Sequence, residues 1–188
     1  MSKLILASAS PRRRELLEFL DIPFEIIPAV GPESVPDGAS PEQAVLALSL
    51  AKAREVADAN PDDLVIGADT VVAVDGAILG KPADEADAAR MLRKLSGREH
   101  RVYTGVTVIG QGRTLSHAEM TRVHFRAMTE EEILSYIATG EPMDKAGAYG
   151  YQGRAGLYVE RIEGDFFNVV GLPLCALGKM LKELGVIS

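Results

Sequence analysis

The sequence predicts an α/β domain with a mixed β-sheet, because strand patterns and helix patterns alternate along the chain. A second observation is a pair of longer strand patterns near the centre of the chain. The 188 residues suggest one domain, 1–188, or one domain divided into two lobes, since domains typically contain about 100 to 200 residues. No segment has the composition of a linker between two independent domains.

The chain begins with an expected strand at 4–7 and a helix from Pro11 to about Leu20. Ser10 can cap this helix, and proline suits the first turn because its missing N–H needs no partner there. Residues 24–27 are typical of a second short strand. The first strand therefore leads directly into a helix N-terminus.

A loop rich in proline and glycine, 31–39, leads to the next helix. Residues 40–43, Ser-Pro-Glu-Gln, match a capping box with proline in the first turn, and the helix is expected to end near Ala59. An apolar strand follows at 64–74 and ends at a turn formed by Asp75-Gly76.

The second half of the chain continues the alternation. The expected elements are a helix at 84–95, strands at 102–108 and 120–125, a capped helix at 129–139, a strand at 157–162 and a helix at 173–184. Five glycines at 140–156 predict a loop region, and Gly185 closes the last helix.

Composition and charge restrict the classes of function. The net charge is −7, so binding to nucleic acid would need a strong local cluster of basic residues, and an anion must bind in a local pocket.

Cys175 is the single cysteine, which excludes an internal disulfide, and its apolar neighbours predict a core position. The apolar stretch at 4–7 is too short for a secretion signal, and no stretch reaches the length of a membrane span. We therefore expect a cytoplasmic protein without a nucleic-acid or membrane partner.

The first candidate site is the segment 8–13, Ser-Ala-Ser-Pro-Arg-Arg, at the start of the first helix. Hydroxyl groups, free backbone N–H groups and guanidinium groups together favour phosphate binding. Cations at a helix N-terminus oppose the helix dipole, so this placement favours a bound anion. The alternative is a capped helix with a solvated basic end.

Asp69 is the most unusual residue of the sequence, because it lies in the middle of an apolar strand pattern. An unpaired carboxylate in a buried strand is costly, and a metal ion or a cationic pocket would relieve that cost. The alternative is a strand-end carboxylate that caps a turn. Glu33 in the first loop could be a second oxygen ligand or simply an exposed residue.

Three lysines are further candidates. Lys81 lies between Gly80 and Pro82, which should restrict the turn and direct its side chain. Lys52 and Lys145 could also be ordinary surface lysines. The histidines lack the spacing of zinc ligands. Cations and carboxylates together suit a nucleoside triphosphate with Mg²⁺ or Mn²⁺, and water is the expected nucleophile.

Several motifs resemble the Maf family of nucleotide pyrophosphatases, in the family's order and over nearly the whole chain. They are LASASPRR at 6–13, GADTVV at 67–72, GKP at 80–82, SGREH at 96–100, EPMDKAGAYG at 141–150 and NVVGLPL at 168–174.

The resemblance implies a two-lobed α/β fold with a long bent mixed sheet, similar to inosine triphosphate pyrophosphatases, and a cleft between the lobes. It also implies a cytoplasmic, metal-dependent homodimer that cleaves a nucleoside triphosphate between its α and β phosphates. Asp69 resembles the catalytic acid of the family, and it is expected to bind the metal with Glu33. The further positions that match the family's cleft are Ser8, Arg13, Glu33, Lys52 and Lys81.

Within the family, Arg12, Thr70 and Gln152 match the branch that acts on dTTP and UTP, and differ from the branch that hydrolyses 7-methyl-GTP. A glutamine amide offers one donor group and one acceptor, so it can pair with the edge of uracil or thymine. Tyr151 departs from the family, in which an aliphatic residue is more usual.

Two other functions stay open at this point. A nucleotidyltransferase also releases pyrophosphate but delivers the nucleotide to an acceptor other than water. A non-catalytic regulator of cell division would bind nucleotide or a protein partner, since the resemblance includes family members linked to septum inhibition.

Overall fold

The computed structural model describes residues 2–188, and its strands form one mixed, open sheet. Within these residues the sheet order is β2-β1-β3-β5-β6-β7, with β4 beside β3. β1 runs parallel to β2 and β3, whereas β4 is antiparallel to β3, and β7 to β6. The strands are β1 (Leu4–Leu6), β2 (Phe24–Ile26), β3 (Leu64–Val74), β4 (Ala77–Leu79), β5 (Glu99–Gly110), β6 (Arg113–Phe125) and β7 (Val159–Glu163). The predicted α/β class with a mixed sheet is confirmed.

The helices begin where local capping chemistry predicts. Ser10, Ser40 and Thr129 are N-caps, and the last two form complete capping boxes. No helix of the described chain combines the length and apolar character needed to cross a membrane. The helices are α1 (Pro11–Glu18), α2 (Pro41–Ala59), α3 (Glu85–Leu95), α4 (Glu130–Ile137), α5 (Phe166–Val170) and α6 (Leu174–Glu183), and the 3₁₀ helices are η1 (Glu141–Asp144), η2 (Ala146–Ala148) and η3 (Arg154–Leu157).

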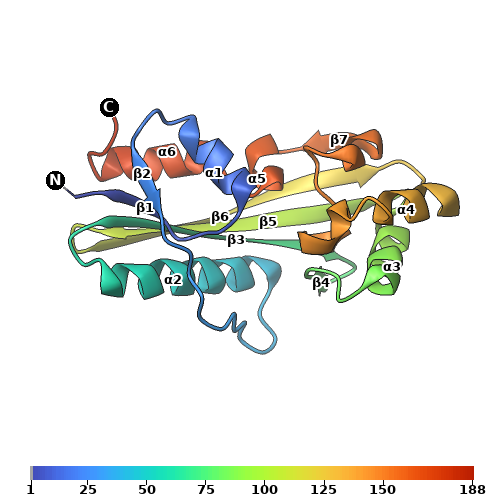
Figure 1. The fold of residues 1–188 in the computed structure, drawn as a ribbon, viewed down its shortest axis with the longest axis horizontal. Helices are drawn as coiled ribbons and strands as arrows, with labels where there is room; N and C mark the ends of the chain where they lie inside the picture. The colour runs from blue at the N-terminus through green and yellow to red at the C-terminus, as the bar shows by residue number, and fades with distance from the viewer. Residues whose placement is uncertain (1) are drawn as a thin grey trace. The chain divides into compact units, whose positions relative to one another are not determined.

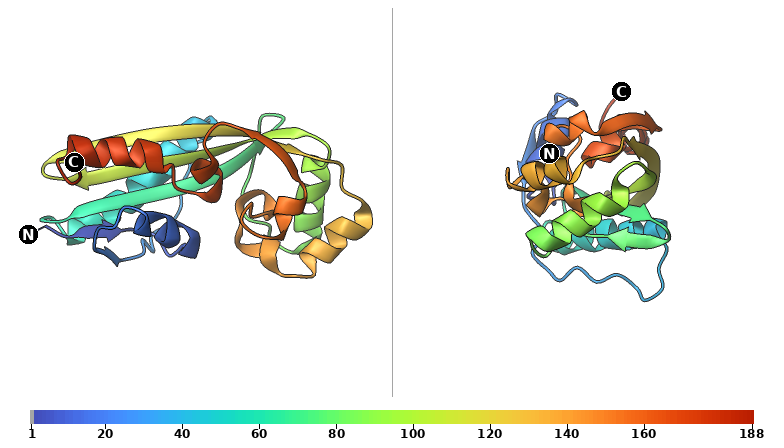
Figure 2. Two further views of the ribbon diagram at one scale, coloured as in Figure 1. Left: turned by 90° about the horizontal axis from the view of Figure 1, so that it is seen from above. Right: turned by 90° about the vertical axis from the view of Figure 1, so that its right-hand side faces the viewer.

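The described chain divides into two compact units. The first unit comprises 2–69, 104–119 and 171–188; there α2 covers one face of the strands, and α1 and α6 cover the other (Figure 1). The second unit comprises 70–103 and 120–170, and in it α3 and α4 lie side by side (Figure 2). Each unit has buried apolar side chains of its own.

Four expectations differ from the structure. β5 and β6 are longer than predicted, since only Gln111 and Gly112 separate them. Both residues have positive φ, 54° and 69°, so they form a two-residue hairpin turn and the strands extend up to it on each side. Cys175 is exposed, so its predicted core position is wrong; the buried stripe of α6 contains Leu177, Met180 and Leu181 instead. The glycine-rich region contains the three 3₁₀ helices, and α5 follows β7 without having been predicted.

Candidate active site

Two glycines allow α2 to lie directly on the sheet of the first unit. A Cβ atom on Gly67 in β3 would lie 2.4 Å from the carbonyl oxygen of Ser49. A Cβ atom on Gly105 in β5 would lie 2.1 Å from the carbonyl oxygen of Val45. Any side chain at these two positions would push the helix away, so glycine is required for the close packing of α2 on both strands.

This packing brings Lys52 of α2 to two carboxylates. Lys52 Nζ lies 2.5 Å from Asp69 Oδ1 and 2.8 Å from Glu33 Oε1. Asp69 is only 8% exposed, whereas the Glu33 side chain is 60% exposed. The ammonium group therefore partners a buried acid that would otherwise be costly. β3 continues beyond Asp69 to Val74, so the alternative of a strand-end cap is wrong.

Arg13 is fixed at the junction of β1 and α1. Its Nε donates to the carbonyl oxygen of Gly171 at 2.8 Å, and its Nη1 donates to Ser8 Oγ at 3.3 Å. Ser8 Oγ also accepts from the backbone N–H of Ser10 at 3.2 Å. Burial lowers the pKa of the Arg13 guanidinium, and the negative charge of Asp69 acts in the opposite direction. The result is a cation and a hydroxyl beside a helix N-terminus, an arrangement suited to phosphate oxygens.

The predicted site residues fall into both units. The first unit contains Ser8, Arg12, Arg13, Glu33, Lys52 and Asp69. The second contains Thr70, which follows Asp69 on β3, together with Lys81 and Gln152, which are exposed.

The contribution of Gly80 that was predicted for the turn before Lys81 is not found. Gly80 does not adopt a positive φ, so the turn does not use the conformational freedom of glycine. Its carbonyl oxygen instead accepts a hydrogen bond from the N–H of Gly147 at 3.0 Å. Lys145 is also no ordinary surface lysine, because its Nζ donates to the Glu141 carbonyl oxygen at 2.6 Å and pairs with Asp144 at 2.7 Å.

Glu55 is a residue that the sequence reasoning missed. It lies one turn after Lys52 on α2, and its Oε1 accepts from the N–H of Val30 at 2.8 Å while its Oε2 accepts from that of Gly31 at 3.0 Å. A Cβ atom on Gly31 would lie 2.7 Å from Glu55 Oε2. α2 therefore holds the backbone just before Glu33 as well as the Glu33 side chain. The three-residue spacing of Lys52 and Glu55 places both on one helix face, but it does not indicate which backbone groups Glu55 binds.

The carboxylate pair fits a divalent metal that binds together with a nucleotide. Within residues 2–188, no three or more His, Cys, Asp and Glu side chains gather as a metal site. Asp69 and Glu33 supply two carboxylates next to one ammonium group. Magnesium is commonly held by one or two carboxylates, and substrate phosphates and water complete its coordination.

Two known proteins are similar in sequence to this chain over nearly its whole length. A dTTP/UTP pyrophosphatase of Geobacillus sp. (strain WCH70) is 56% identical to this chain, over 98% of this chain and 100% of its own. A dTTP/UTP pyrophosphatase of Bacillus cereus (strain AH187) is 50% identical to this chain, over 99% of this chain and 97% of its own. A crystal structure of a protein from Vibrio cholerae covers 74% of this chain and 78% of its own at 13% identity, with a TM-score of 0.38. Residues 3–184 match the family described as Maf-like protein. The chain therefore belongs to the Maf family.

Proposed function

We propose that this chain hydrolyses dTTP and UTP to the nucleoside monophosphate and pyrophosphate, with a divalent metal, Mg²⁺ or Mn²⁺. The observation that carries the proposal is the cluster in which Lys52 faces Asp69 and Glu33, with Arg13 and Ser8 in the same unit. The names of the relatives, dTTP/UTP pyrophosphatase, agree with the chemistry that these residues allow.

In this mechanism, Asp69 orients and deprotonates the attacking water. Lys52 donates to Oδ1, which leaves the second carboxylate oxygen to accept the proton of the water. Glu33 and Asp69 would hold the metal, which when bound neutralises phosphate charge and polarises the scissile phosphate.

The remaining predicted residues bind the nucleotide. Arg13 and Ser8 bind phosphate oxygens, and Arg12 and Lys81 balance the charge that develops on the leaving pyrophosphate. Thr70 and Gln152 select the base, and the amide of Gln152 pairs with the edge of uracil or thymine.

The experiment that tests this function is a panel of nucleoside triphosphates, each given alone with Mg²⁺ or Mn²⁺ in ¹⁸O-labelled water. We expect UTP and dTTP to give the monophosphate and pyrophosphate, with ¹⁸O in the monophosphate and no reaction after chelation of the metal. Release of orthophosphate, or ¹⁸O in pyrophosphate, would contradict cleavage at the α phosphorus. Turnover without an acceptor also excludes a nucleotidyltransferase.

Several features stay predictions: the cytoplasmic location, the absence of nucleic-acid and membrane partners, the homodimer, the cleft between lobes and the role in septum formation. A division phenotype that persisted in Asp69→Asn, a variant expected to lack turnover, would favour the non-catalytic regulator.

A further inference from the structure

One carboxylate in the second unit holds the glycine-rich segment at two points. Glu141 Oε1 accepts from the hydroxyl of Tyr136 at 2.8 Å, and Glu141 Oε2 accepts from the backbone N–H of Arg154 at 3.1 Å. The Tyr136 hydroxyl in turn accepts from the backbone N–H of Gly150 at 3.2 Å. A continuous chain of hydrogen bonds therefore joins Gly150 to Arg154 through two side chains.

Gln152 lies between the two points that are held. The N–H of Gly153 donates to the carbonyl oxygen of Gly150 at 3.1 Å and closes the turn. A Cβ atom on Gly153 would lie 2.2 Å from Glu141 Oε1, and one on Gly150 would lie 2.6 Å from Lys145 Cε. Glycine at both positions thus lets the Glu141 carboxylate and the Lys145 stem lie against the backbone of the turn.

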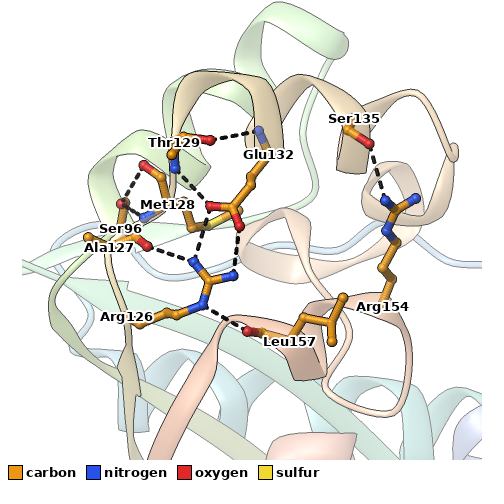
Figure 3. A network of polar contacts seen from close by, with 9 residues as sticks. All are labelled: Ser96, Arg126, Ala127, Met128, Thr129, Glu132, Ser135, Arg154 and Leu157. Atoms are coloured by element: carbon orange, nitrogen blue, oxygen red, sulfur yellow. Dashed lines mark hydrogen bonds and ion pairs between the residues drawn. The ribbon is translucent and has the colours of Figure 1, made fainter.

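Further contacts hold the chain after the turn (Figure 3). Arg154 Nη2 donates to Ser135 Oγ at 3.2 Å, which ties the turn to α4. Arg126 Nε donates to the carbonyl oxygen of Leu157 at 3.0 Å, while its Nη1 and Nη2 bind the Glu132 carboxylate at 3.1 and 2.8 Å. The segment is therefore fixed on both sides of Gln152.

Tyr136 is suited to this role by its burial. Its side chain has no exposed surface, and its ring lies edge-on to that of Tyr158 with centroids 5.7 Å apart. Burial, and the hydrogen bond to Glu141, raise the pKa of the Tyr136 hydroxyl, so it keeps its proton at neutral pH and remains a donor to the carboxylate. A buried phenol can hold the backbone of the turn more rigidly than a solvated side chain can.

We propose that Glu141 and Tyr136 are positioning residues that fix the turn bearing Gln152 and thereby set the choice of base. The inference rests on the proposed hydrolysis of nucleoside triphosphates. Hydrogen bonds discriminate between bases only when the pairing group is held within about 0.5 Å of its place. Asp69 and Lys52 belong to the first unit, so loosening this turn should change base selection without removing the proposed base and the lysine that pairs with it.

The test compares kcat and KM for UTP and CTP in four proteins: wild type, Glu141→Gln, Tyr136→Phe and the control Glu131→Gln. Glu131 is exposed on α4 and lies outside this hydrogen-bond chain. We expect the UTP-to-CTP ratio of kcat/KM to fall by roughly 10-fold in the first two variants, which corresponds to the loss of about one hydrogen bond. The change should lie mainly in KM for UTP, with kcat within about 3-fold of wild type.

A second measurement needs no turnover. Hydrogen exchange of the backbone amides at 150–154 should be faster in Tyr136→Phe than in wild type, and unchanged in Glu131→Gln. If wild type prefers a triphosphate other than UTP or dTTP, the proposed substrate is wrong, and the same comparison is then made on its preferred base. Variants that keep the wild-type ratio, or lose kcat equally for all bases, would overturn the inference.

Discussion

Lys52 of α2 donates a hydrogen bond to Asp69 of β3, with 2.5 Å between Nζ and Oδ1. This contact exists because Gly67, two residues before Asp69, has no side chain to hold α2 away from the sheet. The same ammonium group pairs with Glu33 at 2.8 Å. Substitution of Asp69, substitution of Lys52 and addition of a metal ion therefore all change the charge balance of the same three side chains, Lys52, Asp69 and Glu33.

Asp69→Ala should lower kcat for UTP by at least about 100-fold, because it removes the proposed base and a metal ligand. The fold should survive, since Lys52 keeps Glu33 as a partner. Steady-state kinetics and a thermal melt followed by circular dichroism check both statements. Asp58→Asn, which changes an exposed acid on α2, is the control. Equal activity in Asp69→Ala would remove this residue from the mechanism.

Lys52→Met should destabilise the protein by about 1–3 kcal/mol, because it removes the ammonium group that pairs with Asp69 and Glu33. Millimolar Mg²⁺ should then raise the melting temperature of the variant more than that of wild type, since a dication can replace the lost ammonium charge. Lys179→Met, at an exposed position on α6, controls for the loss of a surface lysine. An equal response to Mg²⁺ in all three proteins would contradict a metal at Asp69 and Glu33.

Gln152→Ala should relax the choice of base more than it slows the reaction, because the amide pairs with the base and takes no part in the chemistry. Gln152→Glu keeps the shape but replaces the donor group with an acceptor, so it should also lose the preference for UTP. The neighbouring Tyr151 packs its ring against Phe166, with centroids 5.2 Å apart. The measurement is kcat/KM across a nucleotide panel, and an unchanged preference in both variants would exclude Gln152 as the selecting group.

Sequence patterns predicted the features that depend on local chemistry. The caps at Ser10, Ser40 and Thr129 each need only residues within one turn. Asp69 was recognisable because an acid interrupts an apolar strand. The start of β6 was not, because residues 113–120 are mostly exposed or half-buried and show no apolar alternation.

Contacts across long stretches of sequence explain the rest of the site. Glu55 binds the backbone of Val30 and Gly31, which lie far from it in the chain, so no local pattern could indicate the pair. The pairing of Lys52 with Asp69 depends on how closely a helix approaches a strand, which is set by packing. The sequence therefore showed which charged residues were candidates for the site, but it did not show which groups each of them contacts.

His100 offers a pH-dependent test of the second unit that is independent of activity. Its ring is buried edge-on against those of Phe125 and Tyr149, with centroids 5.0 and 5.3 Å apart, and its Nε2 lies 2.6 Å from the Tyr149 hydroxyl. Within the described residues, its Nδ1 has no hydrogen-bond partner. Burial lowers the pKa of His100 from 6.5 to about 3, and the charge of His124 acts in the same direction.

The folded pKa of His100 lies below the unfolded value, so between about pH 6.5 and pH 3 the unfolded chain binds the extra proton. The free energy of unfolding should therefore decrease as the pH is lowered through this window. His100 should contribute up to about 1.4 kcal/mol per pH unit to this decrease. His100→Phe should reduce this slope, although it leaves the Tyr149 hydroxyl without a partner and so lowers stability at pH 7. Urea unfolding at pH 4, 5, 6 and 7 measures the slope, and His117→Phe, at an exposed ring, controls for the loss of a histidine from the unfolded chain. The same slope in His100→Phe and wild type would show that His100 is not held neutral by burial.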